Sequence, residues 1–115
     1  MLYSFLVPLT VRAVTLTPQQ QWVEALAQCE SGGRDTIKIL DSNNKYSYGR
    51  LMFQKATWLS YSDEFGTSME NIYNGNLQTT VALYILNDGG WRHWYNCAKK
   101  ITKKIGPYPM PSTPS

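Results

Sequence analysis

The sequence predicts a small α+β domain that is mainly α, with one short β-hairpin and a cleft beside it. Apolar residues recur at helical spacing along three stretches, and two short β-prone segments flank a turn after the first helix. A hydrophobic content of 43% over 115 residues suits one packed domain and excludes wholesale disorder. No apolar run reaches the roughly 18 residues of a spanning helix, and two cysteines are too few for a small disulfide scaffold.

The chain divides into three unequal parts. Residues 1–16 are apolar with Arg12 as their one charge, which is typical either of a secretory signal remnant or of an ordered N-terminal tail. Residues 17–106 carry the predicted helices and the hairpin and form the domain. Residues 107–115 hold four of the six prolines, so we expect a proline-rich tail or the start of a linker there, and no packed element.

The first helix has the clearest boundaries. Thr17 can cap it, Pro18 suits its first position and Gln20 completes a capping box. Apolar residues then follow on one face at positions i, i+4 and i+7, namely Trp22, Leu26 and Cys29. The two glycines at positions 32 and 33 favour non-helical backbone, so the helix ends there.

Turn formers and caps predict the remaining elements. These are strands at 37–40 and 46–49 around a turn at 41–44, a helix at 55–60, a loop or short helix over 62–75, a helix that Asn76 caps and residues 88–90 end, and a last helix from Trp91 to residue 105. This order predicts a catalytic cleft between the hairpin and the helices.

Basic charge is concentrated at the C-terminal end. Residues 89–115 carry a net charge of +5 and no acidic residue, whereas residues 1–88 carry −2. The basic residues of this end are Arg92, Lys99, Lys100, Lys103 and Lys104. Such an end favours a polyanionic partner, namely nucleic acid, anionic lipid or an acidic wall polymer, although a solvated helix face has the same composition.

Glu30 is the first candidate for catalysis, because it lies where the apolar helix face meets the glycine turn. Apolar walls such as Trp22 or Leu26 would desolvate its carboxyl, raise its pKa and keep it protonated as a general acid. The simpler interpretation is a solvated glutamate at a helix end, where the helix dipole disfavours negative charge. Asp41 is the candidate for the second carboxylate that glycoside hydrolysis usually needs, and it is also a good turn residue.

Aromatic residues are numerous, with four tryptophans and eight tyrosines. Tyr48 and Trp91 adjoin glycines and predicted loops, where their rings could stack on a sugar in a cleft. The other tryptophans singled out suit core packing, and they are Trp22, Trp58 and Trp94.

Cys29 and Cys97 lie 68 positions apart. They could form a disulfide between the first and last helices, or they could be two buried thiols. With His93 as the single histidine, the chain offers no credible zinc set, and it has no phosphate-binding loop, dinucleotide fingerprint or nucleophile elbow. We therefore expect neither a metal nor a cofactor.

Three segments, taken in order, resemble the resuscitation-promoting factors and, more broadly, the lysozyme-like lytic transglycosylases. The segment 27–33, AQCESGG, is similar to their catalytic segment. Tyr48-Gly49, Phe53 and Thr57-Trp58 are similar to their hairpin-to-helix segment, and 91–98, WRHWYNCA, fits their closing pattern W-x-x-W-x-x-C-A. Gln78, thirteen residues before Trp91, falls on a family glutamine. The resemblance spans residues 22–105.

This resemblance implies a lysozyme-like domain that cleaves peptidoglycan, with Glu30 as its catalytic acid and a Cys29–Cys97 disulfide. It also implies that Thr57 and Gln78 are cleft residues. Two positions depart from the family, because Met52 stands where a glutamine is usual and Arg50 where glycine or leucine is frequent. The candidate substrate-binding residues are Tyr48, Gln54, Thr57, Gln78 and Trp91.

The resemblance further implies cleavage of the bond between N-acetylmuramic acid and N-acetylglucosamine. A lytic transglycosylase needs a single carboxyl, so Glu30 would protonate the glycosidic oxygen and then accept the proton of the 6-hydroxyl as a 1,6-anhydro ring closes. One alternative is a muramidase that uses water and Asp41. Another is a non-catalytic wall-glycan-binding module, which Met52 favours, and a nucleic-acid binder is a third.

The expected partners are peptidoglycan glycan strands and, through the four lysines between residues 99 and 104, anionic wall polymers. We expect no nucleic acid partner, because few aromatic residues are interleaved with the lysines after Tyr95. We also expect no transmembrane segment, a monomer, and a secreted or cell-envelope location.

Overall fold

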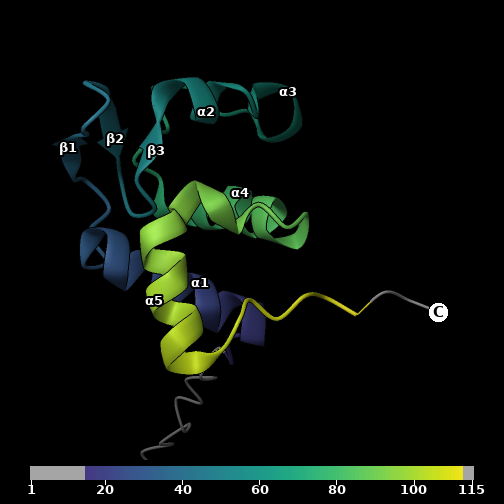
Figure 1. Cartoon of the computed structure of the whole chain (residues 1–115). Helices are drawn as coiled ribbons and strands as arrows, with labels where there is room; N and C mark the ends of the chain where they lie inside the picture. The colour runs from purple at the N-terminus through teal and green to yellow at the C-terminus, as the bar shows by residue number, and fades with distance from the viewer. Residues whose placement is uncertain (1–14, 113–115) are drawn as a thin grey trace, which may run out of the picture.

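The computed structural model describes residues 15–112 and confirms a mainly α domain of the α+β class (Figure 1). Its elements in chain order are α1 (Pro18–Ser31), β1 (Lys38–Leu40), β2 (Tyr46–Tyr48), β3 (Phe53–Gln54), α2 (Lys55–Leu59), α3 (Ser62–Phe65), α4 (Gly75–Asn87), the 3₁₀ helix η1 (Trp91–Trp94) and α5 (Tyr95–Ile105). The sheet, α2 and α3 lie on one side of α4, and α1 and α5 cross on its other side (Figure 1). Between residues 15 and 112, no helix combines the length and the hydropathy that crossing a membrane requires.

Helix α1 begins and ends where its caps predict. The Thr17 hydroxyl accepts a hydrogen bond from the Gln20 amide at 3.1 Å, and the Gln20 side chain accepts one from the Thr17 amide at 2.9 Å, which is the predicted capping box. Gly32 takes the left-handed conformation at φ 66°, which a glycine adopts without steric cost, and so ends the helix.

The three strands form one antiparallel sheet in the order β1-β2-β3. Strands β1 and β2 are the predicted hairpin, with Lys38 opposite Tyr48, and β3 adds a third strand with Gln54 opposite Ser47. The sequence did not predict β3, because two residues are too few to display the alternation that identifies a strand. The cap predicted for α4 was also wrong by two residues, since Asn74 and not Asn76 accepts from the Leu77 amide.

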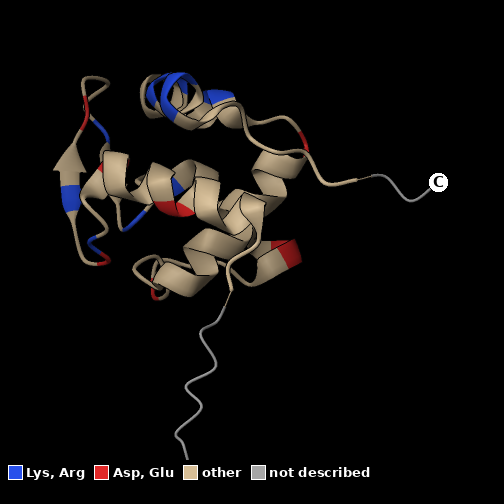
Figure 2. Ribbon diagram, turned by 90° about the horizontal axis from the view of Figure 1, so that it is seen from below, with Lys and Arg blue, Asp and Glu red and all other residues tan. Residues whose placement is uncertain are grey.

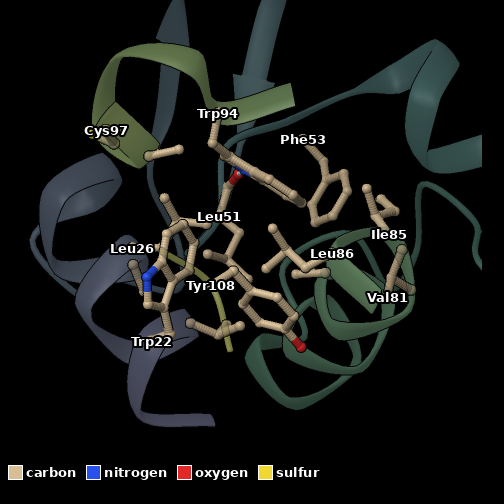
Figure 3. Close-up of a cluster of buried hydrophobic side chains, with 14 of the residues drawn as sticks. Trp22, Leu26, Leu51, Phe53, Val81, Ile85, Leu86, Trp94, Cys97 and Tyr108 are labelled. Atoms are coloured by element: carbon tan, nitrogen blue, oxygen red, sulfur yellow. Dashed lines mark hydrogen bonds between the residues drawn. The ribbon is translucent and has the colours of Figure 1, made fainter. Parts of the chain in front are cut away.

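The core lies where α1 packs against α4 and α5 and where η1 meets the sheet (Figure 3). Leu51, at the centre of this cluster, is fully buried, and its carbonyl accepts a hydrogen bond from Trp94 Nε1 at 2.7 Å. The Phe53 ring lies 5.0 Å from that of Trp58 and 5.7 Å from that of Trp94. Trp22, Trp58 and Trp94 are all buried, which confirms their predicted core positions.

Cys29 and Cys97 form a disulfide, with their Cα atoms 5.8 Å apart. The bond joins the last turn of α1 to the first turn of α5. This decides between the two alternatives that the residues left open. In the chain-entropy description, closing a loop of 68 residues stabilises the fold by roughly 4 kcal/mol.

The first residues of the proline-rich tail are packed, so the expectation of no packed element from residue 107 onward was wrong at Tyr108 and Pro109. Tyr108 is buried, its ring lies 5.5 Å from that of Trp22, and its hydroxyl donates to Asn87 Oδ1 at 2.5 Å. Trp22 Nε1 donates to the Gly106 carbonyl at 3.0 Å, and Gln19 Nε2 donates to the Pro109 carbonyl at 2.9 Å. Residues 107–112, the part of this segment that the structure describes, contain no helix or strand, so these long-range contacts leave no periodic pattern in the sequence.

Candidate active site

Glu30 lies in the last turn of α1, and the residues on either side of it are fixed. Cys29 is bonded to α5, and the Ser31 hydroxyl donates to the Ala27 carbonyl at 3.1 Å and to the Arg50 carbonyl at 2.7 Å. Ser31 is buried, although sequence reasoning assigned it no role. The backbone that carries Glu30 is therefore held from both α5 and the turn before β3.

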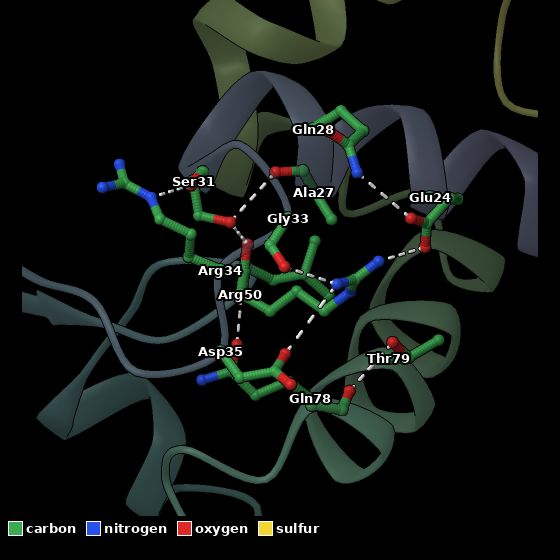
Figure 4. Close-up of polar contacts among 12 residues, drawn as sticks. Glu24, Ala27, Gln28, Ser31, Gly33, Arg34, Asp35, Arg50, Gln78 and Thr79 are labelled. Carbon is green, nitrogen blue, oxygen red and sulfur yellow. Dashed lines mark hydrogen bonds and ion pairs between the residues drawn. The ribbon is translucent and has the colours of Figure 1, made fainter.

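Arg50 fastens the glycine turn that follows Glu30 (Figure 4). Its guanidinium donates to the Gly33 carbonyl at 2.8 Å and to the Glu24 carboxylate, and it lies 3.8 Å from Asp35. The hydrogen bond from Arg50 holds the pKa of Glu24 below its usual value. Arg50 thus ties together α1, the glycine turn and the residues before β3.

A polar cleft of about 360 Å³ opens in front of Glu30. It is lined by Glu30, Asp41, Ser47, Met52, Phe53, Gln54, Thr57, His93 and Trp94. The lining comes from the end of α1, the sheet and its turns, α2 and η1, so the cleft lies between the hairpin and the helices as predicted. Glu30, Asp41, Gln54 and Thr57, which the sequence singled out, are brought together here.

The pKa of Glu30 is raised to about 7, first because its carboxyl is desolvated by burial and second because the negative charge of Asp41 is near. Lys100 on α5 acts in the opposite direction and lowers this pKa. The predicted direction and cause are present, but the predicted walls are different. Met52, Phe53 and Trp94 line the cleft with Glu30, whereas Trp22 does not. A carboxyl with this pKa can both give and take a proton near neutral pH.

Asp41 is held by hydrogen bonds on the cleft side of the sheet. Its Oδ2 accepts from the Ser47 hydroxyl and from Gln54 Nε2, the latter at 2.8 Å. Gln54 also exchanges hydrogen bonds of 3.1 Å with the Asn43 side chain in the hairpin turn. The Asp41 carboxylate is thus fixed by two neighbouring strands while it faces the same cleft as Glu30.

Met52 stands in the cleft with a φ of 55°, in the left-handed region that non-glycine residues rarely adopt. Its amide donates to the Gly49 carbonyl at 3.1 Å, which closes the turn between β2 and β3. The Met52 side chain, at a position where the resemblance implies a glutamine, forms part of the cleft wall.

Three predicted substrate-binding residues lie outside the cleft. Side chains alternate along β2, so Tyr48 lies on the face opposite Ser47, where it joins Tyr46 and Lys38. Gln78 is fully buried, with its amide bound to the backbone of Tyr48, Ile72 and Leu51. Gly49, at φ 78°, leaves the space that this amide fills. The geometry of Gln78 is therefore that of a structural residue.

Trp91 lines a different, apolar groove of about 550 Å³. This hollow, called the apolar groove from here on, is larger than the cleft, and neither Glu30 nor Asp41 lines it. Trp91 and Trp94 are three residues apart on η1, yet Trp91 lines the groove and Trp94 lines the cleft.

Ser47 and His93 are cleft residues that the sequence analysis did not identify as such. The signal for Ser47 was present, because it alternates with two tyrosines in a strand and so belongs to the opposite face. His93 gave no comparable signal, since its place depends on how η1 folds back on the sheet.

Of three comparisons with known proteins, one gives a match. No curated protein and no solved structure matches the chain. The model of one protein family, described as the transglycosylase-like domain, matches residues 17–97. That match includes Glu30, the whole sheet and both cysteines. The chain therefore belongs to the transglycosylase-like domain family.

Proposed function

We propose that this domain cleaves the glycosidic bond between N-acetylmuramic acid and N-acetylglucosamine in peptidoglycan, as a lytic transglycosylase. The single observation that carries this proposal is Glu30, a half-buried carboxyl in a polar cleft with a pKa of about 7. Membership of the transglycosylase-like domain family supports the class of substrate and of bond.

The reaction uses Glu30 twice. In the first step the protonated carboxyl gives its proton to the glycosidic oxygen, and the bond to the muramic acid carbon breaks. The resulting oxocarbenium-like centre is stabilised by the N-acetyl group of the substrate. In the second step the Glu30 carboxylate takes the proton of the 6-hydroxyl, whose oxygen bonds to that carbon and closes the 1,6-anhydro ring. Both steps are accessible near neutral pH because the pKa of Glu30 lies near 7.

Asp41 supports a second candidate, a muramidase that adds water. Its carboxylate lines the same cleft and is close enough to raise the pKa of Glu30. A second carboxylate can act as a nucleophile or activate a water molecule, as in other glycosidases. In the transglycosylase mechanism the same charge keeps Glu30 protonated and stabilises the positive centre.

The test is a digest of purified peptidoglycan by the wild type, Glu30→Gln and Asp41→Asn, with products identified by mass spectrometry. Glu70→Gln, an exposed carboxyl outside the cleft, is the matched control. We expect anhydro products from the wild type and the control, and a loss of about 10²- to 10⁴-fold in Glu30→Gln. Hydrated reducing ends that disappear in both cleft variants would instead indicate the muramidase. Glycan binding without any product, from folded and disulfide-bonded protein, would indicate a non-catalytic module.

The proposal includes a role for the lysines of α5, whose basic residues gather along that helix (Figure 2). Lys99, Lys100, Lys103 and Lys104 are exposed, so they would hold the domain near anionic wall polymers. Replacing all four with glutamine should weaken retention on isolated walls at low salt, and unchanged retention would refute this role.

A further inference from the structure

The apolar groove is a preformed hollow that the proposed reaction does not use. Its floor consists of the buried side chains of Trp22, Leu86 and Tyr108, and Trp91 and the exposed Met110 form its edges. Hydrogen bonds from Trp22 Nε1 to the Gly106 carbonyl and from Tyr108 to Asn87 fix the floor. At about 550 Å³, the groove is within the usual size of a small-molecule site.

The walls of the apolar groove favour a ligand without hydrogen-bonding groups along its length. Among the polar atoms of its aromatic floor, Trp22 Nε1 and the Tyr108 hydroxyl already have partners in the protein. The other uncharged polar side-chain atoms of the lining are the Thr102 hydroxyl and Trp91 Nε1. A glycan or peptide placed here would lose hydrogen bonds to water and regain few, whereas a hydrocarbon chain would lose none.

The charged part of the groove is wholly basic. Lys99 and Lys103 lie one turn apart on α5 and both line the groove, and no acidic side chain joins them there. Lys99 Nζ lies over the Tyr95 ring, 4.9 Å from its centroid, and Tyr95 stacks on Trp91 at 5.8 Å. Both lysines are exposed, so their ammonium groups remain free to meet an anion at the edge of the groove.

Lys100 belongs to another side of α5. It acts on Glu30 in the cleft and is not part of the groove lining. Lys104 follows it by one turn and is also outside the groove. The lysines of α5 therefore separate into a groove pair, Lys99 and Lys103, and an outer pair, Lys100 and Lys104.

We propose that the apolar groove binds a single-chain anionic amphiphile, with its alkyl chain along Trp22, Trp91 and Met110 and its phosphate between Lys99 and Lys103. The combination of an apolar floor and a purely cationic edge selects this chemistry, because it complements both parts of such a molecule. This site is separate from Glu30, so the proposal does not depend on the proposed reaction.

The probe is decyl phosphate below its micelle concentration, titrated into the full chain and followed by tryptophan fluorescence and calorimetry. The comparison probes are decyltrimethylammonium, which has the opposite charge, and octyl phosphate, which has a shorter chain. We expect saturable 1:1 binding of decyl phosphate and weaker binding of the cationic probe. Each methylene removed from the chain should weaken the affinity by about fourfold.

The two lysine pairs provide a matched control on one helix. Lys99→Gln/Lys103→Gln should weaken decyl phosphate binding by roughly five- to tenfold, whereas Lys100→Gln/Lys104→Gln, with the same change in charge, should weaken it less than about twofold. Met110→Asp places a carboxylate at the exposed edge of the groove and should weaken binding without disturbing the core. Glu30→Gln should bind as the wild type does, which separates this proposal from the reaction.

Several results would overturn the proposal. Equal losses in both double variants would mean attraction to the overall charge of α5 and not to the groove. Binding that requires vesicles of anionic lipid, and is absent with monomeric decyl phosphate, would mean a membrane-surface contact. Self-association that depends on protein concentration and is abolished by Met110→Asp would mean that a second copy of the chain occupies the groove.

Discussion

The cleft and the larger apolar groove are two hollows with opposite chemistry, and α5 contributes charge to both. The cleft gathers carboxyl, hydroxyl, amide and imidazole groups around a carboxyl whose pKa is raised by burial. The groove gathers aromatic and aliphatic surface and keeps its charges at the exposed edge. Desolvating Glu30 gives it a reactive pKa and costs stability, whereas the exposed lysines of the groove keep their hydration. Among the residues that line the two hollows, the carboxyl with the raised pKa lies in the polar cleft, and the lysines lie at the exposed edge of the apolar groove.

Removing the disulfide should affect the two hollows most differently, because Cys29 is next to Glu30 and neither cysteine lines the groove. Cys29→Ser/Cys97→Ser should lower the free energy of unfolding by about 2–4 kcal/mol, measured by urea denaturation. Under conditions where the variant is still folded, wall cleavage should fall because α1 is no longer fixed to α5 next to Glu30. Binding of decyl phosphate should persist, since Trp22, Tyr108 and Asn87 hold the groove. Equal loss of cleavage and of groove binding would mean that the two hollows are not independent.

Glu30→Gln should show by how much the buried carboxyl lowers the free energy of unfolding. The native pKa of Glu30 is above its ordinary value of 4.5, so the folded state binds its proton more tightly than the unfolded state does. Stability is therefore lost as the pH rises from about 4.5 through about 7. At pH 8 the variant should be more stable than the wild type by about 1–2 kcal/mol, once partial exposure is allowed for.

At pH 4 the carboxyl is protonated in both states, so Glu30→Gln should then leave the free energy of unfolding nearly unchanged. Urea denaturation at the two pH values measures the difference. The same stability gain at both pH values would show that the amide improves packing, and would remove the evidence for a desolvated charge.

The smallest expected effect is a difference between the pH profiles of two lysine variants in α5. Lys100 lowers the pKa of Glu30, so Lys100→Gln should raise that pKa and move the alkaline limb of the cleavage profile to higher pH. Lys103 lies on the groove side, so Lys103→Gln should leave the limb where it is. A shift of the same size in both variants would show that the overall charge of the helix, and not the position of Lys100, affects Glu30.

Local features of this molecule could be predicted from its sequence, and long-range placement could not. The capping box at Thr17, the glycine end of α1 and the position of Glu30 at that end all depend on neighbours within a few residues. The family resemblance supplied the cysteine pairing, which the residues alone left open. The narrower likeness to the resuscitation-promoting factors, and the catalytic role of Glu30, stay predictions.

The misses in the site have a common cause. Tyr48 and Trp91 were chosen as cleft residues for their type and neighbours, and Gln78 was chosen from the family resemblance. The positions of all three depend on which face of β2, η1 or α4 is covered by another element. The side-chain amide of Gln78 forms its hydrogen bonds with the backbone of Tyr48, Leu51 and Ile72. Tyr48 and Leu51 are distant in the chain, so the sequence around Gln78 does not reveal them. Tyr108 was missed for the same reason, because its partners Asn87 and Trp22 are 21 and 86 positions away in the chain.

The packing of Tyr108 also changes where a tether attached to this domain would begin. A flexible connection counted from the end of α5 would start at Gly106, but the chain stays fastened through the contacts of Tyr108 and Pro109. Four residues of extended, proline-rich chain span roughly 12 Å, and this length does not contribute to the span of a flexible tether. The fixed part of the chain therefore extends past α5 to the contacts of Tyr108 and Pro109, and a tyrosine packed in the core sets the point from which a flexible tether could begin.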